Sequence, residues 1–134
     1  MSGGATRVLR GRVIRGGEAR GVALVSSAAI SFYGGVDPDT GKVIEKGHPL
    51  EGRSVAGRVL VMPVGKGSTV GSYVLYRMAR QGTAPAAILC GSCDTVVAVG
   101  AILGDIPCVD RLDPGGIGDG VVVTVRGEEV VVGE

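Results

Sequence analysis

A glycine-rich turn carries the residues of this chain that are best suited to chemistry. Its sequence is Gly65-Lys66-Gly67-Ser68-Thr69, and it follows an apolar run at residues 58–64. Glycines let the backbone turn sharply and leave room for a ligand to approach. A strand that passes through such a turn into a helix presents backbone N–H groups and small hydroxyls to an anion. We therefore predict that this turn is the working surface.

The elements on either side of the turn must position it. Residues 58–64 read as a buried strand and residues 73–81 as a helix, with Ser68 or Thr69 at the N-cap and Gly82 at the C-terminal end. The expected core-facing stripe of this helix recurs every fourth residue, at Val70, Val74 and Met78.

The rest of the chain alternates short strands with one more helix. Asp94 is expected to cap a helix over residues 95–103. Strands are expected at residues 7–14, 21–26, 42–45, 84–90, 106–109, 121–125 and 130–132. Strands that alternate with helices, with hairpins at both ends, predict an α/β fold with a mixed sheet.

The composition limits the classes of protein to which this chain can belong. The chain has 134 residues, which predicts a single domain over residues 1–134, and it contains 25 glycines but only three tyrosines and one phenylalanine. A formal net charge of +1 and so few aromatic rings do not indicate a surface that binds nucleic acid. No run is long and apolar enough for a membrane span, and the first residues lack a secretory signal, so we expect a cytoplasmic chain with reduced cysteines.

Several motifs together resemble one family, the swivelling domain or small subunit of aconitase X. They are Ser31-Phe32-Tyr33-Gly34-Gly35-Val36-Asp37-Pro38-x-Thr40-Gly41, His48-Pro49-Leu50-x-Gly52 and Gly65-Lys66-Gly67-Ser68-Thr69-x-Gly71-Ser72. Downstream, Ala84-Pro85-Ala86-Ala87-Ile88 and Gly100-Ala101-Ile102-Leu103 continue the pattern. The resemblance covers residues 11–112 in order.

The resemblance implies a swivelling β/β/α domain that works as the small subunit of a hydro-lyase. The implied reaction is dehydration of (R)-5-phosphomevalonate to trans-anhydromevalonate 5-phosphate in the archaeal mevalonate pathway. It also implies a larger partner subunit that carries an iron–sulfur cluster (4Fe-4S), in a heterodimer or a doubled heterodimer, with no metal on this chain. The related cis-3-hydroxy-L-proline dehydratases are an alternative, because the swivelling domain hardly separates the two substrates.

By resemblance to aconitases, Ser68 removes the substrate proton. A serine is a poor base, but Lys66 and the N–H groups of a helix N-terminus would stabilise its alkoxide. The aconitase turn has an arginine for a substrate carboxylate where this chain has Val70, so tricarboxylate binding is not supported. A plain N-cap is the alternative role for Ser68.

Eight further residues complete the predicted site as substrate-binding groups. They are Gly34, Gly35, Asp37, His48, Lys66, Gly67, Thr69 and Ser72. Gly34 and Gly35 suggest a loop that closes over substrate. Asp37 could instead start a turn, and His48, the single histidine, could simply pack.

Other readings remain open at this point. Cys90, Cys93 and Cys108 could be redox-active, could be cluster ligands, or could be small buried hydrophobic residues at strand ends. Other swivelling domains are mobile phosphohistidine carriers, a role for which His48 is the available histidine. A non-catalytic binding module is a third class.

Overall fold

The protein, described here from a computed structural model over residues 6–64 and 69–133, is built on one mixed sheet. The strands are β1 (Arg7–Arg10), β2 (Arg12–Arg15), β3 (Glu18–Val25), β4 (Val59–Val64), β5 (Ala87–Ser92), β6 (Cys108–Asp110), β7 (Val122–Arg126) and β8 (Glu129–Val132). The helices are α1 (Phe32–Gly35), α2 (Val70–Gln81) and α3 (Thr95–Leu103), with a short 3-10 turn at Pro114–Gly116.

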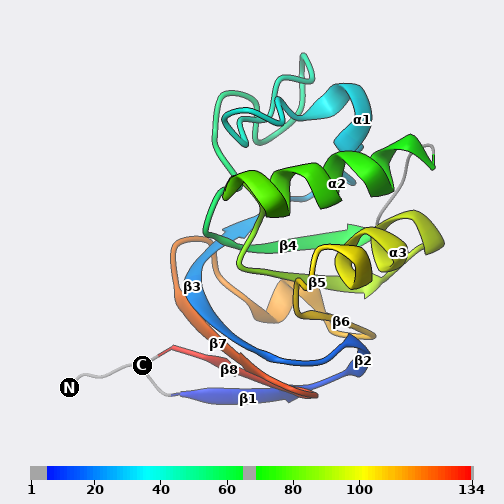
Figure 1. Cartoon of the computed structure of the whole chain (residues 1–134). Helices are drawn as coiled ribbons and strands as arrows, with labels where there is room; N and C mark the ends of the chain where they lie inside the picture. The colour runs from blue at the N-terminus through cyan, green and yellow to red at the C-terminus, as the bar shows by residue number, and fades with distance from the viewer. Residues whose placement is uncertain (1–5, 65–68, 134) are drawn as a thin grey trace.

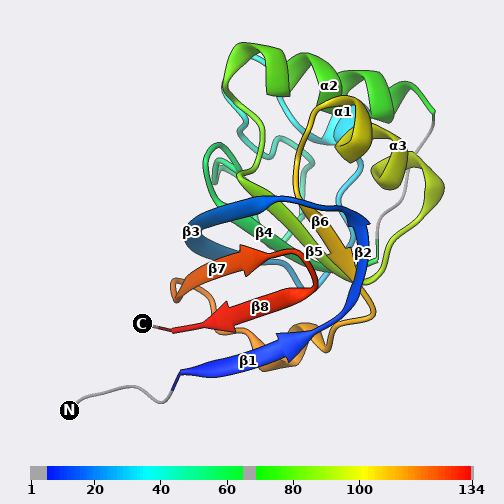
Figure 2. The same ribbon diagram turned by 60° about the horizontal axis from the view of Figure 1, so that its bottom comes forward.

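The sheet bends into two halves, and the helices cover one of them. Strand order is β1-β8-β7-β3-β4-β5-β6-β2. In Figure 1 the helices lie over the half that contains β4 and β5, while β7, β8 and β1 form a layer on the opposite side. The same three layers are visible after rotation (Figure 2). The expected α/β architecture with a mixed sheet is therefore confirmed.

Strand alternation divides the apolar side chains of β4 and β5 between two cores. Leu60 and Met62 belong to the core beneath the helices, while Val59 and Val61 belong to the core between the two halves of the sheet. Successive side chains of a strand point to opposite faces, so a strand buried on both faces must be apolar throughout. This requirement explains the continuous apolar runs at β4 and β5.

β3 joins the two halves. Its first five residues pair with β7 in antiparallel register, from Glu18↔Arg126 to Val22↔Val122. Its last three residues pair with β4 in parallel, from Ala23↔Val59 to Val25↔Val61. The two halves of the sheet are thus one continuous hydrogen-bonded structure.

The helix ends confirm the expected capping. The Asp94 carboxylate accepts a hydrogen bond from the N–H of Val97 at 3.0 Å, and α3 ends at Gly104. Gly82 is left-handed with φ of 84°, and its N–H donates to the carbonyl of Met78. A positive φ at this position explains why a glycine ends α2.

The stripe predicted on α2 is wrong in part. Val70 is 46% exposed, and the buried positions are Gly71, Ser72, Leu75 and Met78. The helix also begins at Val70, three residues before the expected start. The buried face was missed because two of its four positions, a glycine and a serine, give no apolar signal.

The N-terminal hairpin expected from the sequence does not form. Residues 7–14 form two strands, of which β1 pairs with β8 and β2 pairs with β6. The break lies at Gly11, where a Cβ atom would stand 2.3 Å from the Asp110 carbonyl oxygen. Residues 42–45 make isolated bridges only, and the strand expected at 106–109 is shifted to Cys108–Asp110. The C-terminal hairpin of β7 and β8 is confirmed.

Within the described part of the chain, no helix is long and apolar enough to cross a membrane.

Candidate active site

The carboxyl ends of four parallel strands gather the candidate functional segments. β3, β4, β5 and β6 run parallel to their neighbours, so the segments that follow them emerge at one edge of the sheet. Ligands of open α/β sheets bind at this edge. The predicted turn follows β4 here, but Lys66, Gly67 and Ser68 lie outside the described residues. Their roles stay predictions.

The first turn of α2 is described, and it adjoins α3. Thr69 is the N-cap residue, is exposed, and makes no capping hydrogen bond with its side chain. The Ser72 hydroxyl is buried and donates to the carbonyl of Val96 at 2.7 Å. A hollow of about 260 Å³ lies between the two helices, lined by Thr69, Ser72, Tyr73, Thr95, Val96 and Val99. Ser72 therefore fixes the start of α2 against α3, and its hydroxyl proton is used in this hydrogen bond.

Gly34 and Gly35 lie beside the same end of α2. A Cβ atom on Gly71 would stand 3.6 Å from the backbone nitrogen of Tyr33, so α1 approaches the first turn of α2 closely. Gly34 has a φ of 84°, and the Gly35 carbonyl accepts from the N–H of Ile44 at 2.9 Å. The structure thus brings this loop, Thr69 and Ser72 together.

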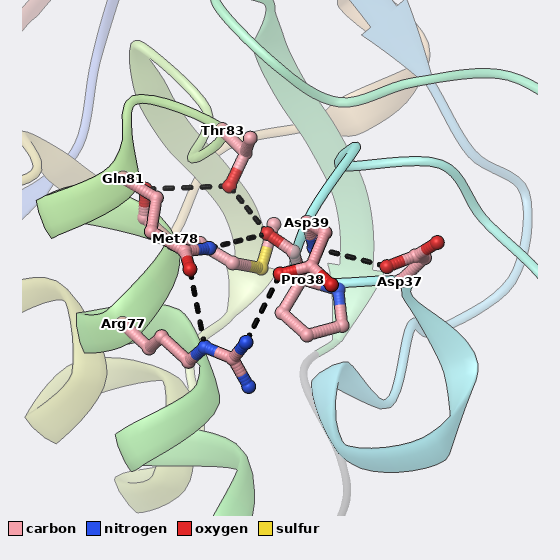
Figure 3. A network of polar contacts seen from close by, with 7 residues as sticks. All are labelled: Asp37, Pro38, Asp39, Arg77, Met78, Gln81 and Thr83. Carbon is pink, nitrogen blue, oxygen red and sulfur yellow. Dashed lines mark hydrogen bonds and ion pairs between the residues drawn. The ribbon is translucent and has the colours of Figure 1, made fainter.

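Asp37 lies near the other end of α2. Its carboxylate accepts from the N–H of Asp39 at 2.9 Å, and the Pro38 carbonyl accepts from the side chains of Gln81 and Thr83 (Figure 3). At a rise of about 1.5 Å per residue, the length of α2 separates this turn from Thr69 by roughly 18 Å. The observed contacts of Asp37 are those of a turn residue.

His48 is buried, with both ring nitrogens bonded to backbone. Nδ1 accepts from the N–H of Leu50 at 3.0 Å, which places the proton on Nε2, 3.1 Å from the carbonyl oxygen of Ala29. The side chain is 6% exposed. His48 therefore ties the 46–52 turn to the segment after β3.

The surface that His48 supports forms part of a larger hollow at the ends of β3 and β4. This hollow, of about 440 Å³, is lined by Val25, Ser26, Ser27, Pro49, Leu50, Arg53, Pro63, Pro114, Gly115 and Asp119. The Arg53 guanidinium lies 3.3 Å from the Asp119 carboxylate. Asp119 also accepts from the N–H of Val25 at 2.9 Å, and this bond, followed by Arg53, lowers the pKa of its carboxyl group.

Sequence reasoning missed Arg53 and Asp119. They are 66 residues apart, and neither stands in a motif of charged residues. The available signal was indirect, because Arg53 follows the His48-Pro49-Leu50-x-Gly52 motif and Asp119 lies between two glycines. The antiparallel pairing of β3 with β7 brings Asp119 to the end of β3, beside the loop between β3 and β4 that carries Arg53.

The three cysteines cluster on the β5 and β6 side of the same edge. Cys90 and Cys108 are fully buried, Cys93 is half-buried, and the Sγ atoms of Cys93 and Cys108 are 3.8 Å apart. Among the described residues, no group of three or more histidine, cysteine, aspartate or glutamate side chains is arranged to hold a metal ion.

Asp110 anchors this side of the edge. It is 1% exposed and accepts two hydrogen bonds from Arg12, at 2.9 and 2.8 Å, and one from the N–H of Cys93 at 3.0 Å. The Arg12 hydrogen bonds, the largest effect, lower the pKa of the Asp110 carboxyl group against the opposing effect of burial.

Comparison with known proteins agrees with the fold. The sequence matches the profile of the aconitase X swivel domain over residues 8–133. It is 54% identical over 127 residues to the phosphomevalonate dehydratase small subunit of Methanocella arvoryzae, covering 92% of this chain and 96% of that one. The corresponding protein of Thermococcus onnurineus is 48% identical over 124 residues, with 92% and 95% covered. The crystal structure of Thermococcus kodakaraensis aconitase X in its holo-form superposes with a TM-score of 0.92 at 47% identity, covering 96% of this chain and 99% of that one.

Proposed function

This chain belongs to the aconitase X swivel-domain family, and from that premise we propose that it is the small subunit of a hydro-lyase that dehydrates (R)-5-phosphomevalonate. The observation that carries the proposal is the 54% identity with a phosphomevalonate dehydratase small subunit along nearly the whole of both chains. A phosphohistidine carrier is disfavoured, because both ring nitrogens of His48 are bonded to backbone within the protein.

Ser68 is the proposed proton acceptor of this subunit. It stands between β4 and α2, where the free N–H groups of the first helical turn and the cation of Lys66 favour an alkoxide. The described residues support this role by holding the start of α2 in place. The Ser72 hydroxyl hydrogen-bonds to α3, and Gly71, which has no side chain, allows α1 to pack closely against α2. Thr69 leaves its hydroxyl free of a capping bond and so remains available to substrate.

The substrate's other groups are proposed to meet this chain along the same edge. Gly34 and Gly35 lie beside the first turn of α2, where a small molecule can contact backbone. We assign Asp37 and His48 to positioning rather than direct contact, because their polar atoms are satisfied within the protein. His48 then acts through the Pro49–Leu50 wall of the larger hollow.

The partner is proposed to be a large aconitase X-type subunit that carries the iron–sulfur cluster. The names of the relatives imply such a partner, and the described residues of this chain do not provide a ligand set for a metal. Under this division, the small subunit supplies the proton acceptor and part of the substrate surface. The assembled pair is a heterodimer or a doubled heterodimer.

Reconstitution tests the proposal. The chain is co-expressed with the large subunit of its organism under anaerobic conditions, and the purified complex is assayed with (R)-5-phosphomevalonate and with cis-3-hydroxy-L-proline. We expect dehydration of the phosphorylated acid and none of the hydroxyproline. Turnover of hydroxyproline alone, by a complex that is fully assembled and loaded with its cluster, would refute the substrate assignment.

A further inference from the structure

Two of the three cysteine thiols, those of Cys93 and Cys108, lie next to each other near the end of β5. Cys93 is the residue after β5, and Cys108 begins β6, the neighbouring parallel strand. Their Sγ atoms are 3.8 Å apart, which is within hydrogen-bonding distance for two thiols. A disulfide requires about 2.05 Å between sulfurs, so the two Sγ atoms must approach each other by about 2 Å to close the pair.

The two thiols differ in access and in charge. Cys93 is half-buried and Cys108 is 0% exposed. Hydrogen bonds from the thiols of Cys108 and Cys90 lower the pKa of Cys93, while the same contacts raise the pKa values of Cys108 and Cys90. Thiolate is the reactive form of cysteine, so Cys93 is the nucleophile of the cluster.

The backbone around Cys93 is held in place. Its N–H donates to the buried carboxylate of Asp110, which also accepts two hydrogen bonds from the Arg12 guanidinium. The next residue, Asp94, caps α3. Cys93 therefore remains beside Cys108, and as a half-buried residue it is more accessible to a small reagent than the fully buried Cys108.

We propose that Cys93 and Cys108 are a hydroperoxide-reactive pair that closes into a reversible intramolecular disulfide. The thiolate of Cys93 attacks one oxygen of the hydroperoxide, the O–O bond breaks, and an alcohol or water leaves with Cys93 as sulfenic acid. The Cys108 sulfur then attacks the Cys93 sulfur and loses its proton, and the sulfenic oxygen leaves as water. The two thiols are oxidised by two electrons, and the hydroperoxide is reduced by two.

The disulfide would join the β5–α3 turn to β6 at the candidate active-site edge. Ser92, the residue before Cys93, pairs with Val64, the last residue of β4 before the predicted reactive turn. The modification site therefore lies one residue from the strand pair that holds that turn. It does not depend on the proposed function, because the chemistry belongs to this chain alone.

Peptide mapping of the full chain tests the proposal. The reduced protein is treated with hydrogen peroxide, free thiols are alkylated under acid denaturing conditions, and the chain is cut before aspartates. Cleavage before Asp94 and Asp105 separates Cys90 and Cys93 from Cys108. We expect one cross-linked peptide pair that lacks two hydrogens and separates on reduction. Only alkylated or over-oxidised thiols, or a Cys90–Cys93 link within one peptide, would overturn the assignment.

Three variants locate the bond. Cys93→Ser should abolish the cross-link, while Cys90→Ser should retain it at the level of the wild type. Cys108→Ser should leave sulfenic acid at Cys93, which a dimedone probe detects even if this core variant is less stable. A cross-link that survives Cys93→Ser, or one that disappears in Cys90→Ser, would contradict the pairing.

Discussion

Substitution of His48 distinguishes most clearly between a structural role for this side chain and a role as a substrate ligand. His48→Ala removes the hydrogen bonds at both ring nitrogens and leaves the N–H of Leu50 buried without this partner. Each lost bond costs roughly 1 kcal/mol, and a buried group left unsatisfied costs about 1–3 kcal/mol. We therefore expect a loss of about 3 kcal/mol in the free energy of unfolding.

The expected loss converts to a large shift in melting temperature. An unfolding entropy of about 2.1 cal/mol/K per residue gives about 0.28 kcal/mol/K for this chain, so about 3 kcal/mol lowers Tm by about 10 °C. Differential scanning calorimetry of the isolated chain measures this shift. Lys46→Ala, an exposed change in the same turn, is the control and should leave Tm within about 2 °C.

Two conservative variants divide the loss between the ring nitrogens. An asparagine oxygen can replace Nδ1 and keep the bond from Leu50, while a glutamine nitrogen can replace Nε2 and keep the bond to Ala29. His48→Asn and His48→Gln should each lose about 1–2 kcal/mol, less than His48→Ala. If His48→Ala melts with the wild type while KM of the assembled enzyme rises tenfold, His48 is a substrate ligand and the structural reasoning fails.

Three further outcomes are expected. Ser68→Ala should reduce turnover of the assembled complex by about 10²–10⁴-fold, while Thr69→Ala, measured in the same assay, should retain far more activity; turnover of Ser68→Ala within tenfold of wild type would place the base elsewhere. The Arg12 hydrogen bonds lower the pKa of the Asp110 carboxyl group, so their contribution to the free energy of unfolding is present above the unfolded-state pKa of about 3.9 and is lost as pH falls through the lower folded-state pKa. The difference in the free energy of unfolding between wild type and Asp110→Asn, measured by denaturant titration, should therefore narrow in acid and not widen. The chain purified alone with iron and sulfide should remain colourless and inactive, and a stoichiometric cluster absorbance would contradict the proposed division between subunits.

Local patterns predicted the elements around the candidate site. The strand at β4, the aspartate cap of α3 and the glycine that ends α2 all depend on residues within a few positions of one another. Such features follow from strand alternation, capping and the left-handed conformation of glycine. They could therefore be read correctly without knowledge of the sheet.

The parts that were missed depend on sheet order. Arg53 meets Asp119 because the antiparallel pairing of β7 with β3 places Asp119 at the end of β3, and the break at Gly11 exists because β1 and β2 pair with different strands. The Asp37 turn was grouped with the reactive turn because both stand in family motifs. The structure instead places the Asp37 turn near the C-terminal end of α2, away from Thr69 at its start, a separation that no local pattern encodes.

The position of β8 between β1 and β7 constrains when this protein can fold. Arg7 pairs with Val132, so the first strand has no partner in the sheet until the last strand has been synthesised. A chain that emerges from the ribosome in order must therefore hold β1 unpaired until β8 has emerged. Pairings so distant in sequence close slowly, because the entropy of a long loop is lost before the contact forms. Completion of the sheet, and any assembly that requires it, is therefore expected to follow synthesis of β8.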